Sequence, residues 1–283
     1  MLMGRYRFHA EFIDPAMPSA FMGVDFRGAF GPALKRVVCA LKHADCADCL
    51  LHRRCLYPHV FEGVLRKNRR AHRSDRDGPS FPVGRMPGRP LMIVARPDRE
   101  RRTGAPHPCV IEPPEDAPAR IRPRETFVCS LLLFGRANES IPYFIQAFEQ
   151  MGRMGLGRPV EGRRARFRLI GVRADDRVLY AGEGQPILDE PVAQDLRKRL
   201  LYDLATAPSP ASGRLTVRLR TPLKLTSVDP DDASLPFPVL IRETLGRIAS
   251  LCHAFGNGAP ALDGPRLMET ASSVRTLSGT LRP

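Results

Sequence analysis

The stretch "MGRMGLGRPVEGRRARFRLIGV", from Met151 to Val172, concentrates glycines and arginines and ends in the alternating pattern typical of a β-strand. A P-loop carries a Lys-Ser or Lys-Thr pair after its glycines and lies between a strand and the helix that follows it. A Rossmann turn has the same order of strand and then helix. Here an amphipathic helical pattern precedes the glycines and a strand follows them, so the order argues against both nucleotide-binding loops. A glycine-rich loop that leads into an arginine-bearing strand is suited instead to a phosphodiester backbone, because the glycines let the chain approach it closely.

Working outward from this stretch, hydrophobic periodicity predicts the elements that surround it. They are a strand at Arg5–Ile13, a helix at Phe26–Leu41, a short strand at Pro90–Ala95, a strand at Thr126–Phe134, a helix with Ser140 as N-cap and Pro142 inside its first turn, and a closing strand at Arg164–Val172. The order strand, helix, strands, helix, strand predicts an α+β domain with a ferredoxin-like (RRM-like) plan, stretched by insertions. We assign residues 1–173 to it.

A second domain of the same kind is expected after a connector at residues 174–212, which holds an extended piece at Val178–Ala181 and a helix at about 192–204. "GRLTVRLRTPLKL" (Gly213–Leu225) predicts a strand, and Phe237–Phe255 predicts a helix. Residues 213–283 thus predict a partial, tandem ferredoxin-like domain. We expect either a chain that continues past Pro283 or a partner that supplies the remaining strands.

The positive charge is clustered. The chain carries 44 Lys and Arg against 30 Asp and Glu, a net charge of +14. Gly63–Thr103 holds twelve basic against four acidic residues, and Met151–Arg173 holds seven against one. Arginine offers a planar fork of donors that fits phosphate oxygens. Clustered arginines therefore predict a polynucleotide backbone as ligand, bound in the second segment by Arg153, Arg158, Arg163, Arg164, Arg166 and Arg168. The alternative is a surface hairpin with solvated arginines.

A cysteine-rich segment, "CALKHADCADCLLHRRC", follows the first predicted helix. Cys46 and Cys49 have the spacing that lets two thiolates bind one Zn²⁺, and Cys39 and Cys55 flank them as third and fourth ligands. His43 and His52 are substitutes for these two. The alternative is four reduced thiols, some of them buried as small hydrophobic groups. We predict a structural zinc site.

Localisation follows from the cysteine count and from the apolar runs. Seven cysteines, an odd number, argue against a disulfide framework and favour the reducing cytoplasm. The start of the chain lacks an apolar signal region. The longest apolar run, "VCSLLLF" (Val128–Phe134), is too short to span a bilayer, so we expect no membrane association.

Taken together, several segments resemble the CRISPR repeat-RNA processing endoribonucleases of the RAMP superfamily, in the branch with a cysteine-bearing N-terminal half. The resemblance lies in "GVDFRGAFGPALKRVVC" (Gly23–Cys39), "CLYPHVFE" (Cys55–Glu62), "LLLFGRANESIPYFIQAFEQMGRMGLGR" (Leu131–Arg158) and "RLTVRLRTPLKL" (Arg214–Leu225). It implies two tandem ferredoxin-like domains that bind the repeat of a CRISPR transcript and cut it without a catalytic metal. The final glycine-rich loop of that family is not found in this sequence.

The resemblance also implies a reaction. The RNA 2′-hydroxyl attacks the adjacent phosphorus, which needs a general base, a general acid and charge stabilisation. It points to His43, Tyr57 and His59 as catalytic candidates and to Lys42 as a seventh RNA-binding residue, which would stabilise the charge on the phosphate. Guide RNA and other CRISPR effector subunits would be partners in antiviral defence. Two alternatives stay open: a non-catalytic guide-RNA-binding subunit, and a zinc-stabilised basic protein of another ribonucleoprotein.

Overall fold

The computed structural model describes residues 1–41, 45–46, 48–52, 54–61, 106–114, 118–188, 192–206, 213–219, 221, 223, 235–258 and 260–279. The chain divides into two compact units. The first comprises Met1–Val64 and His107–Thr221, and the second comprises Leu65–Pro106 and Pro222–Pro283.

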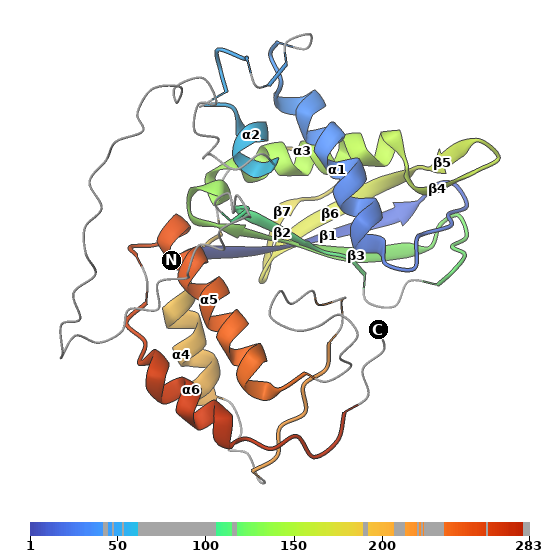
Figure 1. Cartoon of the computed structure of the whole chain (residues 1–283). Helices are drawn as coiled ribbons and strands as arrows, with labels where there is room; N and C mark the ends of the chain where they lie inside the picture. Colours follow the sequence, from blue (N-terminus) through green and yellow to red (C-terminus); the bar gives the residue numbers. More distant parts are fainter. Residues whose placement is uncertain are drawn as a thin grey trace, which may run out of the picture. The chain divides into compact units, whose positions relative to one another are not determined.

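An antiparallel sheet forms the centre of the first unit (Figure 1). Its strands lie in the order β2-β3-β1-β6-β7, and β8 pairs with the start of β1. Each neighbouring pair is antiparallel. The strands are β1 (Leu2–Phe12), β2 (Cys109–Glu112), β3 (Thr126–Phe134), β6 (Phe167–Ala174), β7 (Arg177–Tyr180) and β8 (Gln194–Asp195). The predicted mixed α+β class is therefore confirmed.

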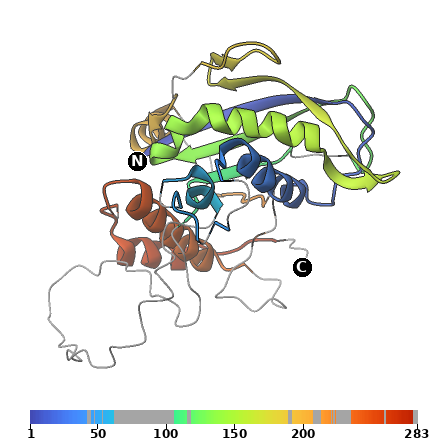
Figure 2. The same cartoon turned by 90° about the horizontal axis from the view of Figure 1, so that it is seen from above.

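Two helices cover one face of this sheet, as both views show (Figures 1 and 2). They are α1 (Met22–Val38) and α3 (Ile141–Met154), and they pack against each other. The predicted apolar face of α3 is fully buried, and it consists of Ile141, Phe144, Ile145, Phe148 and Met151. Aromatic rings join the layers, because Phe148 stacks on Phe8 of β1 at 4.1 Å and contacts Phe30 of α1 at 5.2 Å between ring centroids.

The first helix begins four residues before the predicted start and ends three residues before the predicted end. A polar contact explains the early start, since both the backbone N–H and the hydroxyl of Ser19 donate to the Asp25 carboxylate, at 2.7 and 2.8 Å. This carboxylate lies in the first turn, where a negative charge also complements the helix dipole. Pro32 lies inside α1 and does not end it.

Further short elements complete the described part of this unit. They are α2 (Leu56–Phe61), the 3-10 helix η1 (Gly135–Ser140), the hairpin strands β4 (Leu156–Val160) and β5 (Arg163–Ala165), and α4 (Leu196–Thr206). The predicted strand at Gly213–Leu225 is wrong for residues 213–219, which have no regular secondary structure and no strand partner. The predicted strand at Pro90–Ala95 lies outside the described residues.

The second unit contains two helices in its described part, α5 (Phe237–Phe255) and α6 (Gly264–Ser273), which contact each other. The helix α5 has the bounds that its periodicity predicted. The helix α6 was not predicted, although its start carries clear signals. Asp263 caps it by accepting a hydrogen bond from the backbone N–H of Arg266 at 3.1 Å, and Pro265 lies in its first turn.

Candidate nucleic-acid interface and cysteine pocket

The glycine-arginine stretch folds as a β-hairpin between α3 and β6 (Figure 1). Strand β4 pairs with β5, and the register joins Val160 to Arg163 across a two-residue turn. Both turn residues have positive φ, 49° at Glu161 and 78° at Gly162. This combination is typical of the type I′ turn, whose twist matches that of the two strands. The stretch is therefore an ordered hairpin.

The other glycines of this stretch are required by contacts within the protein. A Cβ on Gly152 would lie 2.2 Å from the Phe167 carbonyl oxygen, which means that α3 meets β6 at this point without room for a side chain. Gly155 has a φ of +86°, and a Cβ there would lie 2.7 Å from Arg164. These glycines were interpreted as positions of close approach to a phosphate backbone. The glycines instead allow close approach to the neighbouring strands β5 and β6. Only the arginines therefore support phosphate binding by this stretch.

Six of the seven predicted RNA-binding residues lie on adjacent elements at this end of the sheet. Arg158 is on β4, and Arg163 and Arg164 are on β5. Arg166 directly precedes β6, Arg168 is the second residue of β6, and Arg153 is in the last turn of α3. All six are exposed. The seventh, Lys42, lies outside the described residues, as does the whole of the first basic segment, Gly63–Thr103.

These arginines differ in their partners. Arg166 binds Asp14 through two hydrogen bonds of 2.8 and 3.2 Å, and Arg168 contacts both oxygens of Glu11 at 3.0 and 3.2 Å. Arg153 lies 3.4 Å from Glu183. Within the described ranges, Arg158, Arg163 and Arg164 form no ion pair. The hairpin thus presents three exposed arginines without a salt bridge, of which Arg163 is near enough to Asp14 to contribute to the lowering of its pKa.

A shallow hollow lies beside the hairpin and gathers three of the arginines. Its lining includes Arg153, Arg166 and Arg168 together with Glu149 and Glu183. The hydrogen bond from Arg166, the largest effect, lowers the pKa of Asp14, so this carboxylate stays charged at neutral pH. Glu149 accepts a short hydrogen bond from the Tyr180 hydroxyl. The hollow therefore has fixed charges of both signs, and each of its three arginines is paired with a carboxylate.

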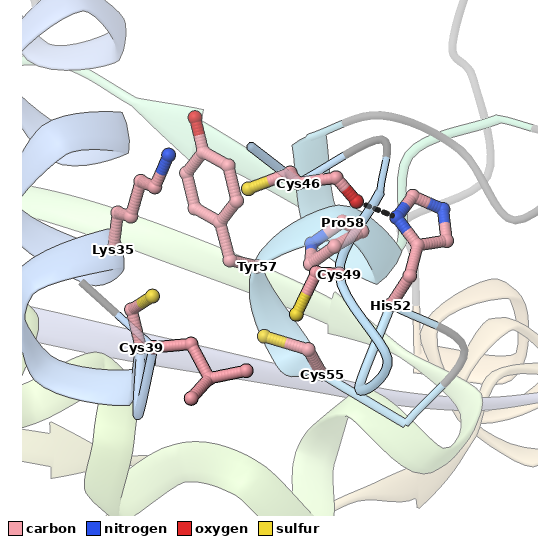
Figure 3. Close-up of a pocket in the computed structure, with 9 residues that line it drawn as sticks. Lys35, Cys39, Cys46, Cys49, His52, Cys55, Tyr57 and Pro58 are labelled. Atoms are coloured by element: carbon pink, nitrogen blue, oxygen red, sulfur yellow. Dashed lines mark hydrogen bonds between the residues drawn. The ribbon is translucent and has the colours of Figure 1, made fainter. Parts of the chain in front are cut away.

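The four predicted zinc ligands lie around one small pocket at the other end of α1 (Figure 3). Cys39 directly follows α1, Cys46 and Cys49 come from the loop after it, and Cys55 precedes α2. The pocket is completed by Lys35, Leu41, His52, Tyr57 and Pro58. All seven cysteines of the chain are free thiols. The thiols are close enough to influence one another, because burial first, and then the charges of the other three, raise the pKa of Cys55.

Lys35 is a residue of this pocket that the sequence analysis missed. Hydrogen bonding to Cys46 and then charge attraction to it raise the pKa of Lys35. Its ammonium also lies over the ring of Tyr57, 5.5 Å from the centroid. A helical spacing could have revealed it, because Lys35 lies one turn before Cys39 on the same side of α1. Here a cation faces a cluster of thiols.

The donor set of the pocket fits zinc in its chemistry, since four thiols that can ionise line one hollow. Their arrangement is more open than a metal centre. In the part of the chain that the structure describes, no three or more His, Cys, Asp or Glu side chains are grouped closely enough to hold a metal ion. Zinc binding would therefore draw the thiols inward. His52, a predicted substitute ligand, has its Nδ1 2.6 Å from the Cys46 carbonyl oxygen.

The structure separates the catalytic candidates that it describes. Tyr57 and His59 both lie on α2. Residues two positions apart on a helix project about 200° apart around its axis, so these two side chains diverge. Tyr57 lines the cysteine pocket and stacks on Phe61, whereas His59 is not part of that lining. Burial lowers the pKa of His59. His43 lies outside the described residues.

His107 is a second polar residue that sequence reasoning passed over. Its Nδ1 lies 2.7 Å from the Val60 carbonyl oxygen. A carbonyl oxygen can only accept, so Nδ1 carries the proton. Its Nε2 then accepts from the guanidinium of Arg27 at 3.3 Å. The ring thus joins α1, α2 and the residues before β2, and no sequence spacing predicts this contact.

The hairpin and the cysteine pocket lie at opposite ends of α1. The hairpin contacts the chain just before this helix, since the backbone N–H of Arg158 donates to the Met17 carbonyl oxygen at 3.0 Å. The pocket begins at Cys39, directly after the helix. At the usual rise per residue, a helix of this length extends over about 26 Å. The predicted RNA-binding arginines and the described catalytic candidates, Tyr57 and His59, therefore belong to two separate regions.

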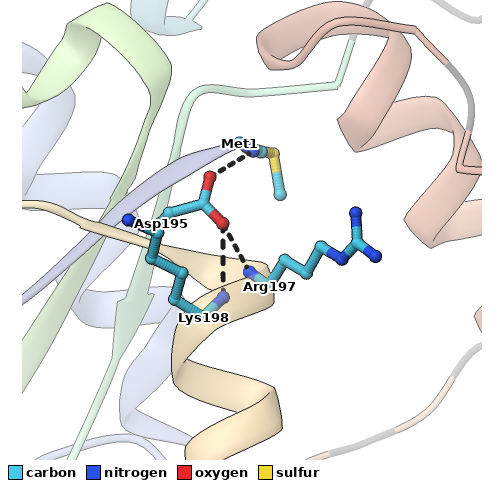
Figure 4. A network of polar contacts seen from close by, with 4 residues as sticks. All are labelled: Met1, Asp195, Arg197 and Lys198. Carbon is cyan, nitrogen blue, oxygen red and sulfur yellow. Dashed lines mark hydrogen bonds and ion pairs between the residues drawn. The ribbon is translucent and has the colours of Figure 1, made fainter.

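A polar network joins the start of β1 to the start of α4 (Figure 4). The Met1 ammonium binds one oxygen of Asp195 at 3.2 Å. The other oxygen accepts from the backbone N–H groups of Arg197 and Lys198, at 3.0 and 3.3 Å, and so caps α4. The hydrogen bond from Lys198, the largest effect, and the Met1 ammonium lower the pKa of Asp195.

Comparison with known protein families gives a match that ends at this network, at residue 198. The model of the family AF_1859_N, described as an N-terminal domain, matches residues 1–198, which include the whole sheet and the first turn of α4. No curated protein matches the chain. Among the described residues, none of the helices combines the length and the apolar composition needed to span a membrane.

Proposed function

The chain belongs to the AF_1859_N family, and we propose that it is a CRISPR precursor-RNA processing endoribonuclease that binds the repeat of the transcript and generates guide RNA. One observation carries the RNA-binding part of this proposal. Six exposed arginines on β4, β5, β6 and α3 and just before β6 gather at one end of the sheet, and three of them form no salt bridge in the described part of the chain. Such a cluster suits successive phosphates of a polynucleotide.

We further propose that the first unit is a ferredoxin-like domain. Two features support this. Strands β1 and β2 are separated in the sheet by β3, with α1 between them in the chain, and β3 and β6 are separated by β1, with α3 between them. This is the arrangement of two split βαβ units. A tandem second domain of the same kind is also part of the proposal.

The proposed cleavage uses the RNA's own 2′-hydroxyl as nucleophile and leaves a 2′,3′-cyclic phosphate and a 5′-hydroxyl. Tyr57 would serve as a proton donor, with the Lys35 ammonium over its ring as a nearby positive charge. His59 would serve as a general base, because its lowered pKa keeps the imidazole neutral at physiological pH. His43 is the remaining candidate for this role. The RNA would have to reach α2 from the hairpin, along a distance of about 26 Å.

We propose that Cys39, Cys46, Cys49 and Cys55 hold a structural Zn²⁺. Four free thiols around one pocket support this site, and a bound cation would relieve the mutual repulsion of their thiolates. The metal would fix the loop after α1 to α2 and so position Tyr57. The reducing cytoplasm is the compartment in which these thiols would stay available.

A non-catalytic guide-RNA-binding subunit of a CRISPR ribonucleoprotein is the second candidate function. The divergence of Tyr57 and His59 on α2 favours it, because a base and an acid must face the same phosphodiester. The arginine cluster supports both candidates equally. The two differ only in whether the bound RNA is cut.

Cleavage of a labelled cognate repeat RNA by the full-length protein in EDTA tests the proposal. A control RNA carries one 2′-deoxy substitution at the cut site. Cleavage to a cyclic phosphate that the deoxy substitution blocks would support the endoribonuclease. Tight binding without cleavage would favour the guide-RNA-binding subunit. Absence of binding would refute both.

A further inference from the structure

The sheet face that α1 and α3 leave uncovered carries a second group of arginines. Side chains alternate along β1, so that Tyr6, Phe8 and Ala10 are buried while Arg5 and Arg7 are exposed. Along β6, the exposed positions that share this face include Arg168 and Arg173. None of these was predicted as a binding residue except Arg168. We call this surface the open face.

Two of these arginines oppose each other directly. The register of β1 and β6 places Arg7 opposite Arg173. Arginines in this position repel, because the Cβ atoms of directly opposed residues lie only about 4.5–5.5 Å apart. The other two arginines are compensated, Arg5 by Glu112 at 2.6 Å and Arg168 by Glu11. Among the residues that the structure describes, Arg7 and Arg173 have no carboxylate partner.

The open face lacks exposed aromatic rings on its described strands. The exposed positions there are charged, small or aliphatic, and they include Val128 of β3 and Ile170 of β6. The phenyl and phenol rings of β1 point into the core, and His9 of the same strand is only half-exposed. Sheet surfaces that bind single-stranded RNA through its bases use exposed aromatic rings. A ligand of this face would therefore be held by its charge.

We propose that Arg7 and Arg173 form a phosphate-binding site on the open face, which takes the sugar-phosphate backbone of RNA. The opposed charges are unfavourable without a ligand, and a phosphate between them would neutralise both. The site rests on the proposed RNA-binding function and extends it to a surface beyond the hairpin.

The site continues the arginine cluster of the hairpin along one strand. Arg168 and Arg173 lie near the two ends of β6. Five steps along a strand, at about 3.3 Å for each residue, cover about 17 Å. Arg166, just before β6, and the hairpin arginines extend the line in the other direction. A single RNA strand would thus contact the hairpin with one segment and the open face with another.

The test measures the affinity of the full chain for labelled oligouridine RNA as a function of salt. The variant Arg7→Gln/Arg173→Gln removes two phosphate contacts, and each contact contributes about 0.7 to the slope of log K against log salt for single strands. We expect the slope to fall by about 1.4. The affinity loss relative to the parent would then be about sevenfold greater at 50 mM than at 200 mM salt.

Matched variants separate this site from general charge effects and from misfolding. Arg7→Lys/Arg173→Lys keeps both charges and should keep the slope. Arg36→Gln removes a basic side chain from α1, away from the open face, and should leave the slope unchanged. Thermal unfolding at low salt should show the Gln variant to be at least as stable as the parent, since it loses a repulsion.

Three results would overturn the inference. The first is a salt slope that Arg7→Gln/Arg173→Gln leaves unchanged and Arg163→Gln/Arg164→Gln lowers. This result would remove the open-face site and leave the proposed RNA-binding function intact. A second is a slope that the Arg36→Gln control lowers equally. The third is a parent protein that binds neither oligouridine nor the repeat RNA, which would remove the proposed function as well.

Discussion

Substitution of Gly152 by alanine is expected to destabilise the first unit, although alanine is the better helix former. The added Cβ would lie 2.2 Å from the Phe167 carbonyl oxygen and 3.1 Å from its ring, so α3 and β6 must move apart. Overpacking of this kind costs about 1–3 kcal/mol. The exchange of glycine for alanine inside a helix returns about 0.5–1 kcal/mol. Because the clash is with a backbone oxygen, which no rotamer change can relieve, the cost falls in the upper half of this range. The net result is a loss of about 1–2.5 kcal/mol, or about 2–10 °C in Tm.

Gly28 provides the matched control, because it also lies inside a helix and a Cβ there would meet nothing within 4 Å. Gly28→Ala should stabilise the protein by about 0.5–1 kcal/mol. Urea unfolding of both variants, followed by circular dichroism, measures the two free energies. The critical result is that the two substitutions change the free energy of unfolding in opposite directions. A Gly152→Ala protein as stable as Gly28→Ala would show that α3 and β6 are not in close contact at this position.

Three further predictions concern the interface and the cysteine pocket. Arg163→Gln/Arg164→Gln should lower the salt slope of RNA binding by about 1.4–1.8, and a parent-like slope would assign both arginines to the solvated surface. The purified protein should contain about one equivalent of zinc by elemental analysis, because four thiolates bind a single ion, and Cys46→Ser/Cys49→Ser should lose this zinc. A metal-free protein with an unchanged fold would contradict the zinc site. Arg166 lowers the pKa of Asp14, so their ion pair stabilises the folded state at neutral pH and stops doing so as the pH falls through the lowered pKa. The stability difference between the parent and Arg166→Gln should therefore shrink on acidification, and a difference that grows would reverse the sign of this linkage.

The elements that could be predicted from the sequence are those whose signal is local and long. The apolar positions of α3 recur along the whole helix, and β3 has the predicted bounds. Strand β2 escaped prediction because so short a strand carries too little periodicity, and it exists only through its pairing with β3. Helix α6 was missed although Asp263 and Pro265 mark its start.

The candidate site was less predictable, for a different reason. The arginine cluster follows from composition, but the partners of Arg166 and Arg168 are Asp14 and Glu11, which lie 152 and 157 positions away in the chain. The glycines between α3 and the hairpin could not be assigned to internal packing without knowing that Phe167 lies beside Gly152 of α3. Local spacing does not contain such long-range contacts.

The central position of β1 has a consequence for synthesis of the chain. This strand leaves the ribosome well before its two long neighbours, β3 and β6, which are encoded far downstream of it. At about 5–20 residues per second, β1 waits roughly 6–23 s for its first long partner. During that interval Tyr6, Phe8 and Phe12 have no sheet to join, and nascent chains with exposed apolar strands are prone to aggregate. The alternating arginines of β1 act against this, because their charge opposes the association of two nascent strands.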